Sequence, residues 1–367
     1  AAMALFALQS YAPSGGKGHR TSLRGGGPLT TLVLPGATPE ERPSLWHSLW
    51  LNTVAPGLED PEEEALPALE RLLPWLVPTR TSAQGETTTP DDTHAMQAYW
   101  GMPRRIRLIF EENSERRPCD LTGLVDDLVV KAYRTRPSGT NYSGFLHPLS
   151  PHYRQKPGAA EWLPLHGQPG RIGYRHYVGL VQEDDSQLRR PAQAVAQARM
   201  RIKYRRSRRA RLLAVGWDMD KMKARDFVES EMPLHLVSGP AAEVFDLLVK
   251  QLVAAAREAE HHLVRRLREA LPGLRDRDGG LAQVARESFW QESETPFHAI
   301  LDRLATKVEE AVDDEPTLRS LLNESRRAWL ARLRALALSL FDRWVPHADL
   351  DHLRESELQA VIAARSN

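Results

Sequence analysis

The feature that most constrains the fold is a change of pattern near Pro240. After it, apolar residues recur at spacings of three and four, as they do on the buried face of an amphipathic helix. Segments with Gly, Pro or Asp interrupt this pattern at residues 271–280, 313–317 and 345–349, which divides it into four predicted helices. Because short connections favour antiparallel neighbours, the pattern predicts an up-down four-helix bundle. The apolar stripes are Val244, Leu247, Leu248, Leu252, Leu263, Leu267 and Leu271; Phe297, Ile300, Leu301, Leu304 and Val308; Leu322, Trp329, Leu333, Leu336 and Leu340; and Leu353, Leu358 and Val361.

Before Pro240 the pattern is mixed, with short segments that Gly and Pro punctuate. Some of them alternate or are rich in β-branched residues, which predicts strands, and others carry leucines and tryptophans at helical spacing. The fold class expected is therefore α+β, with an irregular domain over residues 1–238 and a bundle domain over residues 240–367. The predicted strands are residues 105–110, 171–181 and 209–217, and the predicted helices are residues 40–53 and 61–77.

Composition limits the kinds of partner and compartment. The 49 basic and 48 acidic residues give a net charge of +1, so only local clusters of cations can indicate a nucleic-acid partner. The single cysteine, Cys119, excludes an internal disulfide framework and fits a reducing compartment, so we expect a cytoplasmic protein. The sequence has no apolar run of about twenty residues, and we expect no membrane role. The apolar opening at residues 3–8 suggests that material upstream is missing.

The most distinctive segment is residues 14–34, in which six glycines and three cations precede an apolar run. Glycine lets the backbone approach a polyanion closely, and Lys17, Arg20 and Arg24 add positive charge beside exposed N–H groups. The spacing matches neither a Walker A loop nor the dinucleotide-binding G-x-G-x-x-G, which argues against a nucleotide hydrolase. The segment therefore predicts phosphate contact, and the alternative is a glycine-rich hinge with solvated charges.

A second cationic region runs from Arg199 to Arg225. It contains eleven Lys or Arg residues against two acidic ones, Asp218 and Asp220. A protein that neutralises several phosphates gains affinity from counterion release, without a positive charge overall. The region favours nucleic-acid binding, although a solvated charged face remains the ordinary alternative.

Catalytic interpretations find less support in the sequence. Asp91, Asp92 and His94 are of metal-ligating types, but the two aspartates are adjacent and no later pair completes a recognisable site. The sequence has no G-x-S-x-G motif, and Cys119 has no signature of a nucleophile. We expect no enzyme activity, no metal and no cofactor, and the alternative function is a metal-dependent nucleic-acid enzyme that uses Asp91, Asp92 and His94.

Four sequence blocks, residues 23–32, 94–108, 138–151 and 216–234, together resemble the CasA family, the large subunits of type I-E CRISPR Cascade complexes. The resemblance covers essentially the whole chain and corresponds to the later part of the family sequence. It implies a DNA-binding subunit of an antiviral surveillance complex, which recognises a protospacer-adjacent motif mainly from the minor groove and opens the duplex for guide pairing. The partners it implies are double-stranded target DNA, other Cascade subunits including the small subunits with crRNA, and a helicase-nuclease.

The resemblance also assigns DNA contacts to individual positions. The family's glycine loop maps onto Gly16, Lys17 and Gly18, and Gly18 is the position expected to pack against the groove. The family's lysine finger corresponds to Arg136, and its wedge falls at Lys221. With the flanking residues, the predicted DNA-binding set is Gly15, Gly16, Lys17, Gly18, Arg20, Arg24, Arg136, Asp220, Lys221 and Met222.

Cys119 corresponds to one member of a cysteine pair in this family. Thr122 stands at the position of the second cysteine, so the resemblance implies no zinc site.

Overall fold

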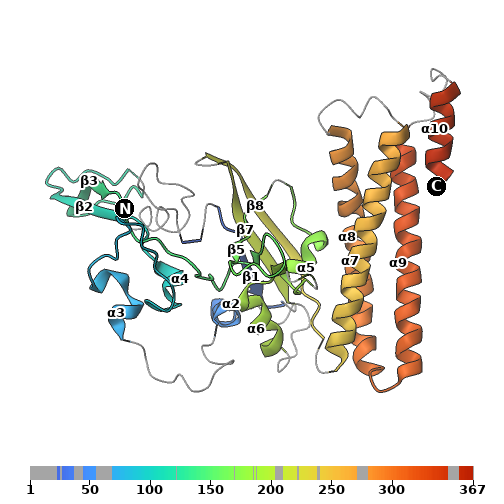
Figure 1. The fold of residues 1–367 in the computed structure, drawn as a ribbon, viewed down its shortest axis with the longest axis horizontal. Helices are drawn as coiled ribbons and strands as arrows, with labels where there is room; N and C mark the ends of the chain where they lie inside the picture. Colours follow the sequence, from blue (N-terminus) through green and yellow to red (C-terminus); the bar gives the residue numbers. More distant parts are fainter. Residues whose placement is uncertain are drawn as a thin grey trace.

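The computed structural model shows a mixed helix-and-strand region followed by a bundle of long helices (Figure 1), as the sequence predicts. The division into two domains at residues 238–240 stays a prediction. The structure describes residues 23–24, 27–36, 44–54, 68–120, 122–168, 170–184, 186, 188–202, 210–220, 223–237, 240–270, 280–345 and 355–366.

The main sheet of the mixed region has three strands in the order β1-β7-β8, and each pair is antiparallel. Burial alternates along β7, and its inward-facing Leu212 and Ala214 are buried in the core, because successive side chains of a strand point to opposite faces. The predicted strand at residues 209–217 is confirmed and extends further, to Asp220. The three strands are β1 (Thr30–Leu34), β7 (Arg211–Asp220) and β8 (Lys223–Pro233).

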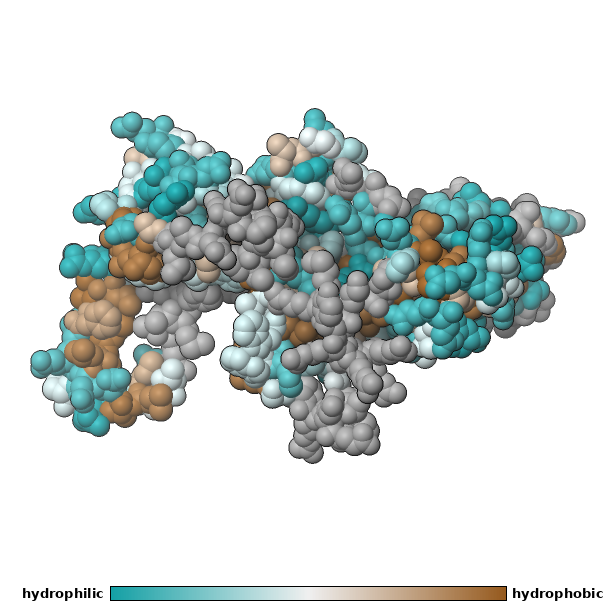
Figure 2. Space-filling model, turned by 90° about the horizontal axis from the view of Figure 1, so that it is seen from below, coloured by the Kyte–Doolittle hydropathy of each residue, from teal (hydrophilic) through white to brown (hydrophobic). Residues whose placement is uncertain are grey.

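A separate two-stranded hairpin lies at the end of the molecule away from the bundle (Figure 1) and consists of β2 and β3. Its first strand confirms the prediction for residues 105–110. Hydrophobic surface also gathers at this end when the molecule is seen from below (Figure 2), and the exposed side chains of α3 and η1 include Leu69, Trp75 and Leu76. The elements here are α3 (Leu69–Leu72), η1 (Pro74–Leu76), α4 (Gln97–Trp100), β2 (Arg105–Glu112) and β3 (Leu128–Arg136).

The prediction of a strand at residues 171–181 is wrong. The segment forms a 3-10 turn and a short helical turn, and Gly179 adopts a φ of +104°, which an extended strand does not contain. Most of its apolar side chains are buried, as they would be in a strand, which explains the apolar pattern; they are Ile172, Tyr174, Tyr177, Leu180 and Val181. The remaining small elements are α2 (Leu45–Asn52), β4 (His152–Tyr153), β5 (Leu163–Pro164), η2 (Tyr174–His176), α5 (Tyr177–Leu180), β6 (Arg189–Arg190) and α6 (Gln193–Ile202).

Three long helices make up most of the bundle, and a shorter helix, α10, contributes Val361 and Ala364 to the same core. The side chain of Asp314 caps the third long helix by accepting a hydrogen bond from the backbone N–H of Thr317. Within the described residues, no helix is both long and apolar enough to span a membrane. The helices are α7 (Ala241–Ala270), α8 (Gly280–Glu310), α9 (Glu315–Trp344) and α10 (Glu355–Ser366).

One hydrophobic core runs through the sheet region and the bundle. At the junction, the ring of Tyr174 stacks on Phe297 of α8 with 4.2 Å between ring centroids, and edges of Trp290 and Trp329 close around it. The Tyr174 hydroxyl lies 2.7 Å from Ser293 Oγ, so its polar atom is satisfied inside the core. The two regions therefore share a core, although their architectures differ.

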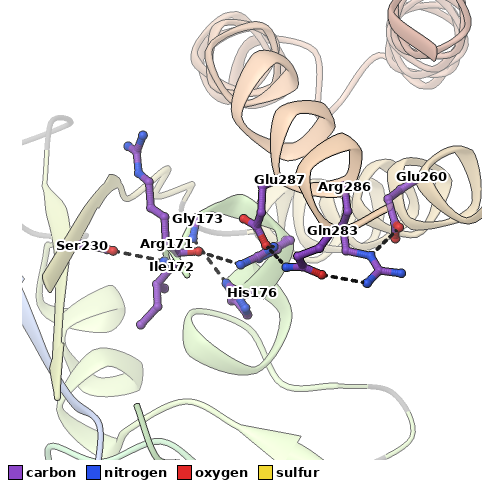
Figure 3. A network of polar contacts seen from close by, with 10 residues as sticks. Arg171, Ile172, Gly173, His176, Ser230, Glu260, Gln283, Arg286 and Glu287 are labelled. Atoms are coloured by element: carbon purple, nitrogen blue, oxygen red, sulfur yellow. Dashed lines mark hydrogen bonds and ion pairs between the residues drawn. The ribbon is translucent and has the colours of Figure 1, made fainter. Parts of the chain in front are cut away.

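A polar network borders this junction (Figure 3). The backbone N–H of Ile172 donates to Ser230 Oγ on β8, and the guanidinium of Arg175 donates to Glu287 on α8 at 2.9 Å. Glu287 also accepts from Gln283, one turn earlier on the same helix. The turn at η2 is thus held by the sheet on one side and by the bundle on the other.

Candidate nucleic-acid interface

The end of the glycine-rich segment is packed against β7. Gly27 has a φ of +67°, and a Cβ added to it would lie 2.5 Å from both Met219 Cγ and the carbonyl oxygen of Trp217. Its own carbonyl oxygen accepts a hydrogen bond from the backbone N–H of Gly167. Only glycine satisfies both the left-handed backbone and this close approach, so the described end of the glycine-rich segment, at Gly27, lies against the β7–β8 hairpin.

Arg24 has a structural role in the same segment. Its side chain is buried, and its Nη2 atom donates to Ser150 Oγ at 2.6 Å and to Thr30 Oγ1 at 2.8 Å. These bonds join the glycine-rich segment to the block of residues 138–151. The DNA contact predicted for Arg24 stays a prediction, and the structure gives its guanidinium internal partners.

The other blocks singled out in the sequence converge on the same region. The hydroxyl of Tyr142 donates to Gln97 Oε1 at 3.0 Å and accepts from the backbone N–H of Met102. A Cβ added to Gly101 would lie 2.7 Å from Leu23 Cδ1. Residues 94–108, 138–151 and 216–234 therefore all surround the end of the glycine-rich segment, although more than a hundred residues of sequence separate the outer two.

The β7–β8 hairpin carries an aromatic pair near its end. Trp217 and Phe227 are directly opposite in the strand register, with 4.9 Å between ring centroids and exposed fractions of 43% and 45%. Asp218, whose side chain is buried, accepts from Arg225 at 2.7 Å, and this bond raises the pKa of Arg225 above its ordinary value. These cross-strand pairs brace the strand ends that precede and follow the predicted wedge.

Three of the predicted DNA-binding positions lie within the described residues. Asp220 is exposed and lies opposite Lys223 in the strand register, at the end of the β7–β8 hairpin. Arg136 is exposed at the end of β3, on the β2–β3 hairpin. The third is Arg24. Gly15, Gly16, Lys17, Gly18, Arg20, Lys221 and Met222 lie outside the described residues.

Of the residues of the alternative metal site, Asp92 and His94 form contacts within their own loop, and the carbonyl oxygen of Asp91 accepts from the guanidinium of Arg71 on α3. One carboxylate oxygen of Asp92 accepts from the backbone N–H and the hydroxyl of Thr89, and these bonds lower the pKa of Asp92 below its ordinary value. His94 Nδ1 accepts from the backbone N–H of Met96. The part of the chain that the structure describes contains no group of three or more His, Cys, Asp or Glu side chains placed to hold a metal ion.

Comparison with protein families decides the relationship of the chain. Residues 1–340 match the family model of CRISPR-associated protein Cse1. The chain belongs to the Cse1 family. Cse1 and CasA name the same Thermus protein, so the resemblance seen in the sequence is confirmed. Comparison with curated proteins gives no match.

Solved Cse1 structures share the fold. The chain aligns with a CasA structure from Thermus thermophilus at a TM-score of 0.53 and 18% identity, over 98% of this chain and 68% of that one. Thermobifida fusca Cse1 gives a TM-score of 0.55 at 17% identity, over 92% of this chain and 61% of that one. A chain of a CRISPR RNA-guided surveillance complex gives a TM-score of 0.57 at 16% identity, over 93% of this chain and 60% of that one. The Cse1-family fold therefore extends over nearly all of this chain and about two thirds or less of these relatives.

Where the sheet region meets the bundle, this Cse1-family chain buries two histidines against each other. His235, which follows β8, places Nε2 2.9 Å from Nδ1 of His298 on α8. Burial lowers the pKa of His235 to about 4, and burial with the neighbouring His235 ring lowers the pKa of His298 to about 3. Both rings are neutral in the folded protein at neutral pH, and protonation would place a charge in the junction.

We expect this pair to make the protein sensitive to acid. Because both pKa values lie below the ordinary histidine value of about 6.5, the unfolded state binds more protons, and the stabilisation is complete above that pH and is lost as the pH falls toward about 4. Each such histidine should remove about 1.4 kcal/mol of unfolding free energy per pH unit in that interval. Denaturant unfolding of the wild type and of His298→Asn between pH 7 and 4.5 measures the slope. A shallower slope is expected for the variant, while His261→Asn, on the exposed face of α7, should match the wild type; equal slopes for all three would contradict the assignment.

Proposed function

We propose that the chain is the DNA-binding subunit of a CRISPR RNA-guided surveillance complex of the type I-E Cascade class. It recognises the protospacer-adjacent motif in duplex DNA and destabilises the neighbouring base pairs so that the guide RNA can pair. Membership of the Cse1 family supports the complex. The observation that carries the DNA-binding role is the contact of Gly27 with Met219 and Trp217, which joins the glycine-rich segment to the β7–β8 hairpin.

This contact supports DNA recognition because it unites two elements that suit different steps. A glycine-rich backbone with Lys17 and Arg20 can approach the sugar-phosphate edge of a groove closely. A hairpin end with Lys221, Met222 and neighbouring aromatics can enter an opening base step, since proteins that kink DNA from the minor groove insert apolar side chains in this way. An element that reads the motif and an element that opens the duplex need to act on adjacent base pairs.

Two other surfaces of the chain suit contacts with the other subunits of the complex. Helix α9 exposes the cations Arg327, Arg332 and Arg334, and the opposite end of the molecule exposes the apolar surface of α3 and η1. Exposed apolar surface of this kind is typical of subunit contacts. We assign residues 1–238 to DNA recognition, with α3 and η1 as an additional subunit contact, and residues 240–367 to interaction with DNA and with the other Cascade subunits, including the small subunits on the crRNA. Cleavage of the target falls to a recruited helicase-nuclease, and this chain has no catalytic role.

Replacing Gly18 with aspartate tests the proposal. The added side chain would carry a negative charge to the position expected at the groove, so we expect the assembled complex to lose about tenfold or more in affinity for duplex DNA with the motif. Electrophoretic mobility shift with guide RNA and all subunits present measures this loss. Gly280→Asp is the matched control, because it adds the same charge at the start of α8, where a Cβ meets nothing within 4 Å. Full motif-dependent binding by the Gly18→Asp complex would refute the proposal.

A further inference from the structure

The β2–β3 hairpin carries four arginines on one face. Arg105 lies directly opposite Arg136 in the strand register, and Arg107 lies directly opposite Arg134. Directly opposite residues share a face of the ribbon, and so do residues two apart on one strand. We call these four residues, Arg105, Arg107, Arg134 and Arg136, the arginine face.

This arrangement costs the hairpin stability. Like charges directly opposite each other on antiparallel strands are destabilising, and here two such pairs are adjacent. Within the described residues, no carboxylate pairs with any of the four, and Arg107, Arg134 and Arg136 are exposed. The face therefore presents four close positive charges without the acidic residues that would neutralise them.

In the rest of the same hairpin, the cations are neutralised by nearby carboxylates. Glu111, on the arginine side of the ribbon but past the bulge, accepts from Lys131 at 2.7 Å and pairs with Arg117. Arg116 pairs with Asp127 at 2.7 Å. Cations in the distal part of the hairpin are thus balanced locally, and the surplus of charge is confined to the four paired positions.

The spacing of the four arginines suits the binding of a linear polyanion. Successive arginines on one strand are spaced by two residues, or roughly 7 Å, and the two strands place a second row about 5 Å away. A guanidinium donates two parallel hydrogen bonds to phosphate oxygens, so the four side chains offer several such contacts in two rows. A two-stranded ribbon fits the major groove of B-form DNA, whereas the major groove of A-form RNA is too narrow for side chains to read.

We propose that the arginine face binds the phosphodiester backbone of duplex DNA. This inference rests on the proposed function for the identity of the duplex as the target. It adds a contact that does not depend on the motif, on a hairpin separate from the β7–β8 hairpin. Three of the four residues, Arg105, Arg107 and Arg134, have no role in the DNA-binding set predicted from the sequence.

The test replaces all four arginines with glutamine in the full-length chain, assembled with its partner subunits and guide RNA. Binding to a labelled duplex is measured over a series of salt concentrations. We expect the plot of log affinity against log salt to become less steep by about 3.6 for four lost phosphate contacts, and by about half as much for Arg107→Gln with Arg134→Gln alone. Removing like-charge pairs should leave the fold intact, and thermal unfolding checks this.

The matched control is Arg116→Gln with Arg117→Gln, which removes two arginines of the same hairpin that are already ion-paired. Its salt slope should equal that of the wild type. An unchanged slope in the quadruple variant would overturn the proposal, and so would a loss of assembly on the guide RNA with normal binding to DNA. The preference for duplexes with the motif should survive in the variant with Arg107→Gln and Arg134→Gln, which keeps Arg136. A wild-type complex without that preference would refute the proposed function instead, so the two failures are distinguishable.

Discussion

Replacing Tyr174 with alanine is expected to lower the free energy of unfolding by about 3–5 kcal/mol, the range typical of deleting a buried aromatic ring. Tyr174 is only 1% exposed, and its ring contacts Phe297, Trp290 and Trp329. Because Tyr174 belongs to the turn at η2 and its three neighbours belong to α8 and α9, the loss falls on the junction between the sheet region and the bundle. Denaturant unfolding monitored by tryptophan fluorescence measures it.

Tyr174→Phe is the matched control for this prediction. It keeps the ring but removes the hydroxyl that lies 2.7 Å from Ser293 Oγ, and that serine still donates to the carbonyl oxygen of Phe289. We therefore expect a loss of only about 1 kcal/mol. If alanine costs no more than phenylalanine, the stacked ring does not hold the junction.

The same variants test the division into two domains. A continuous core predicts that the wild type unfolds in one transition. Removing the ring should weaken the coupling between the regions, so Tyr174→Ala is expected to unfold in two separate steps if residues 1–238 and 240–367 are each able to fold. A single transition at lower denaturant would mean that neither region is stable alone.

The helices of the bundle and the strands β2 and β7 could be predicted from the sequence because each depends on a local period. The apolar positions of α7 repeat at three and four over thirty residues, and tertiary contacts do not have to be known to recognise the pattern. The strand prediction for residues 171–181 was wrong because the structure of this segment depends on tertiary contacts. Most of its apolar side chains are buried through tertiary contacts, such as that of Tyr174 with Phe297 more than a hundred residues later, and Gly179 with its positive φ interrupts any strand.

In the candidate site, too, the features with a local sequence pattern could be predicted, and those that depend on tertiary contacts could not. Composition and glycine content indicated phosphate contact, but the contact between Gly27 and Met219 joins residues 192 positions apart and has no local signal. The arginine face left a partial signal, since arginines alternate with other residues in both RIRL and YRTR. Only the strand register shows that the two alternations fall on one face, because a shift of one residue would place them on opposite faces.

The wedge assignment at Lys221 stays a prediction, and the structure describes the strands on either side of it. The strands β7 and β8 stay paired as far as Asp220 and Lys223. In the aromatic pair, Trp217 lies three residues before Asp220 and Phe227 lies four residues after Lys223. Lys221 and Met222 follow β7 directly in the sequence and precede β8, and their role as a wedge is tested by the next prediction.

Replacing Lys221 and Met222 together with alanine is expected to slow formation of the guide-target hybrid by roughly 30- to 100-fold, because unstacking a base step costs a few kcal/mol and about 1.4 kcal/mol corresponds to a factor of ten. The initial, motif-dependent encounter should change little, since the wedge contacts form only after the duplex opens. Stopped-flow fluorescence of a labelled target strand separates the two steps. On a duplex with a preformed bubble beside the motif the defect should largely disappear, because the base step is already unstacked. A double variant that is equally slow on bubbled and fully paired DNA would show that these two residues hold DNA without opening it, and the wedge would then have to lie elsewhere in the chain.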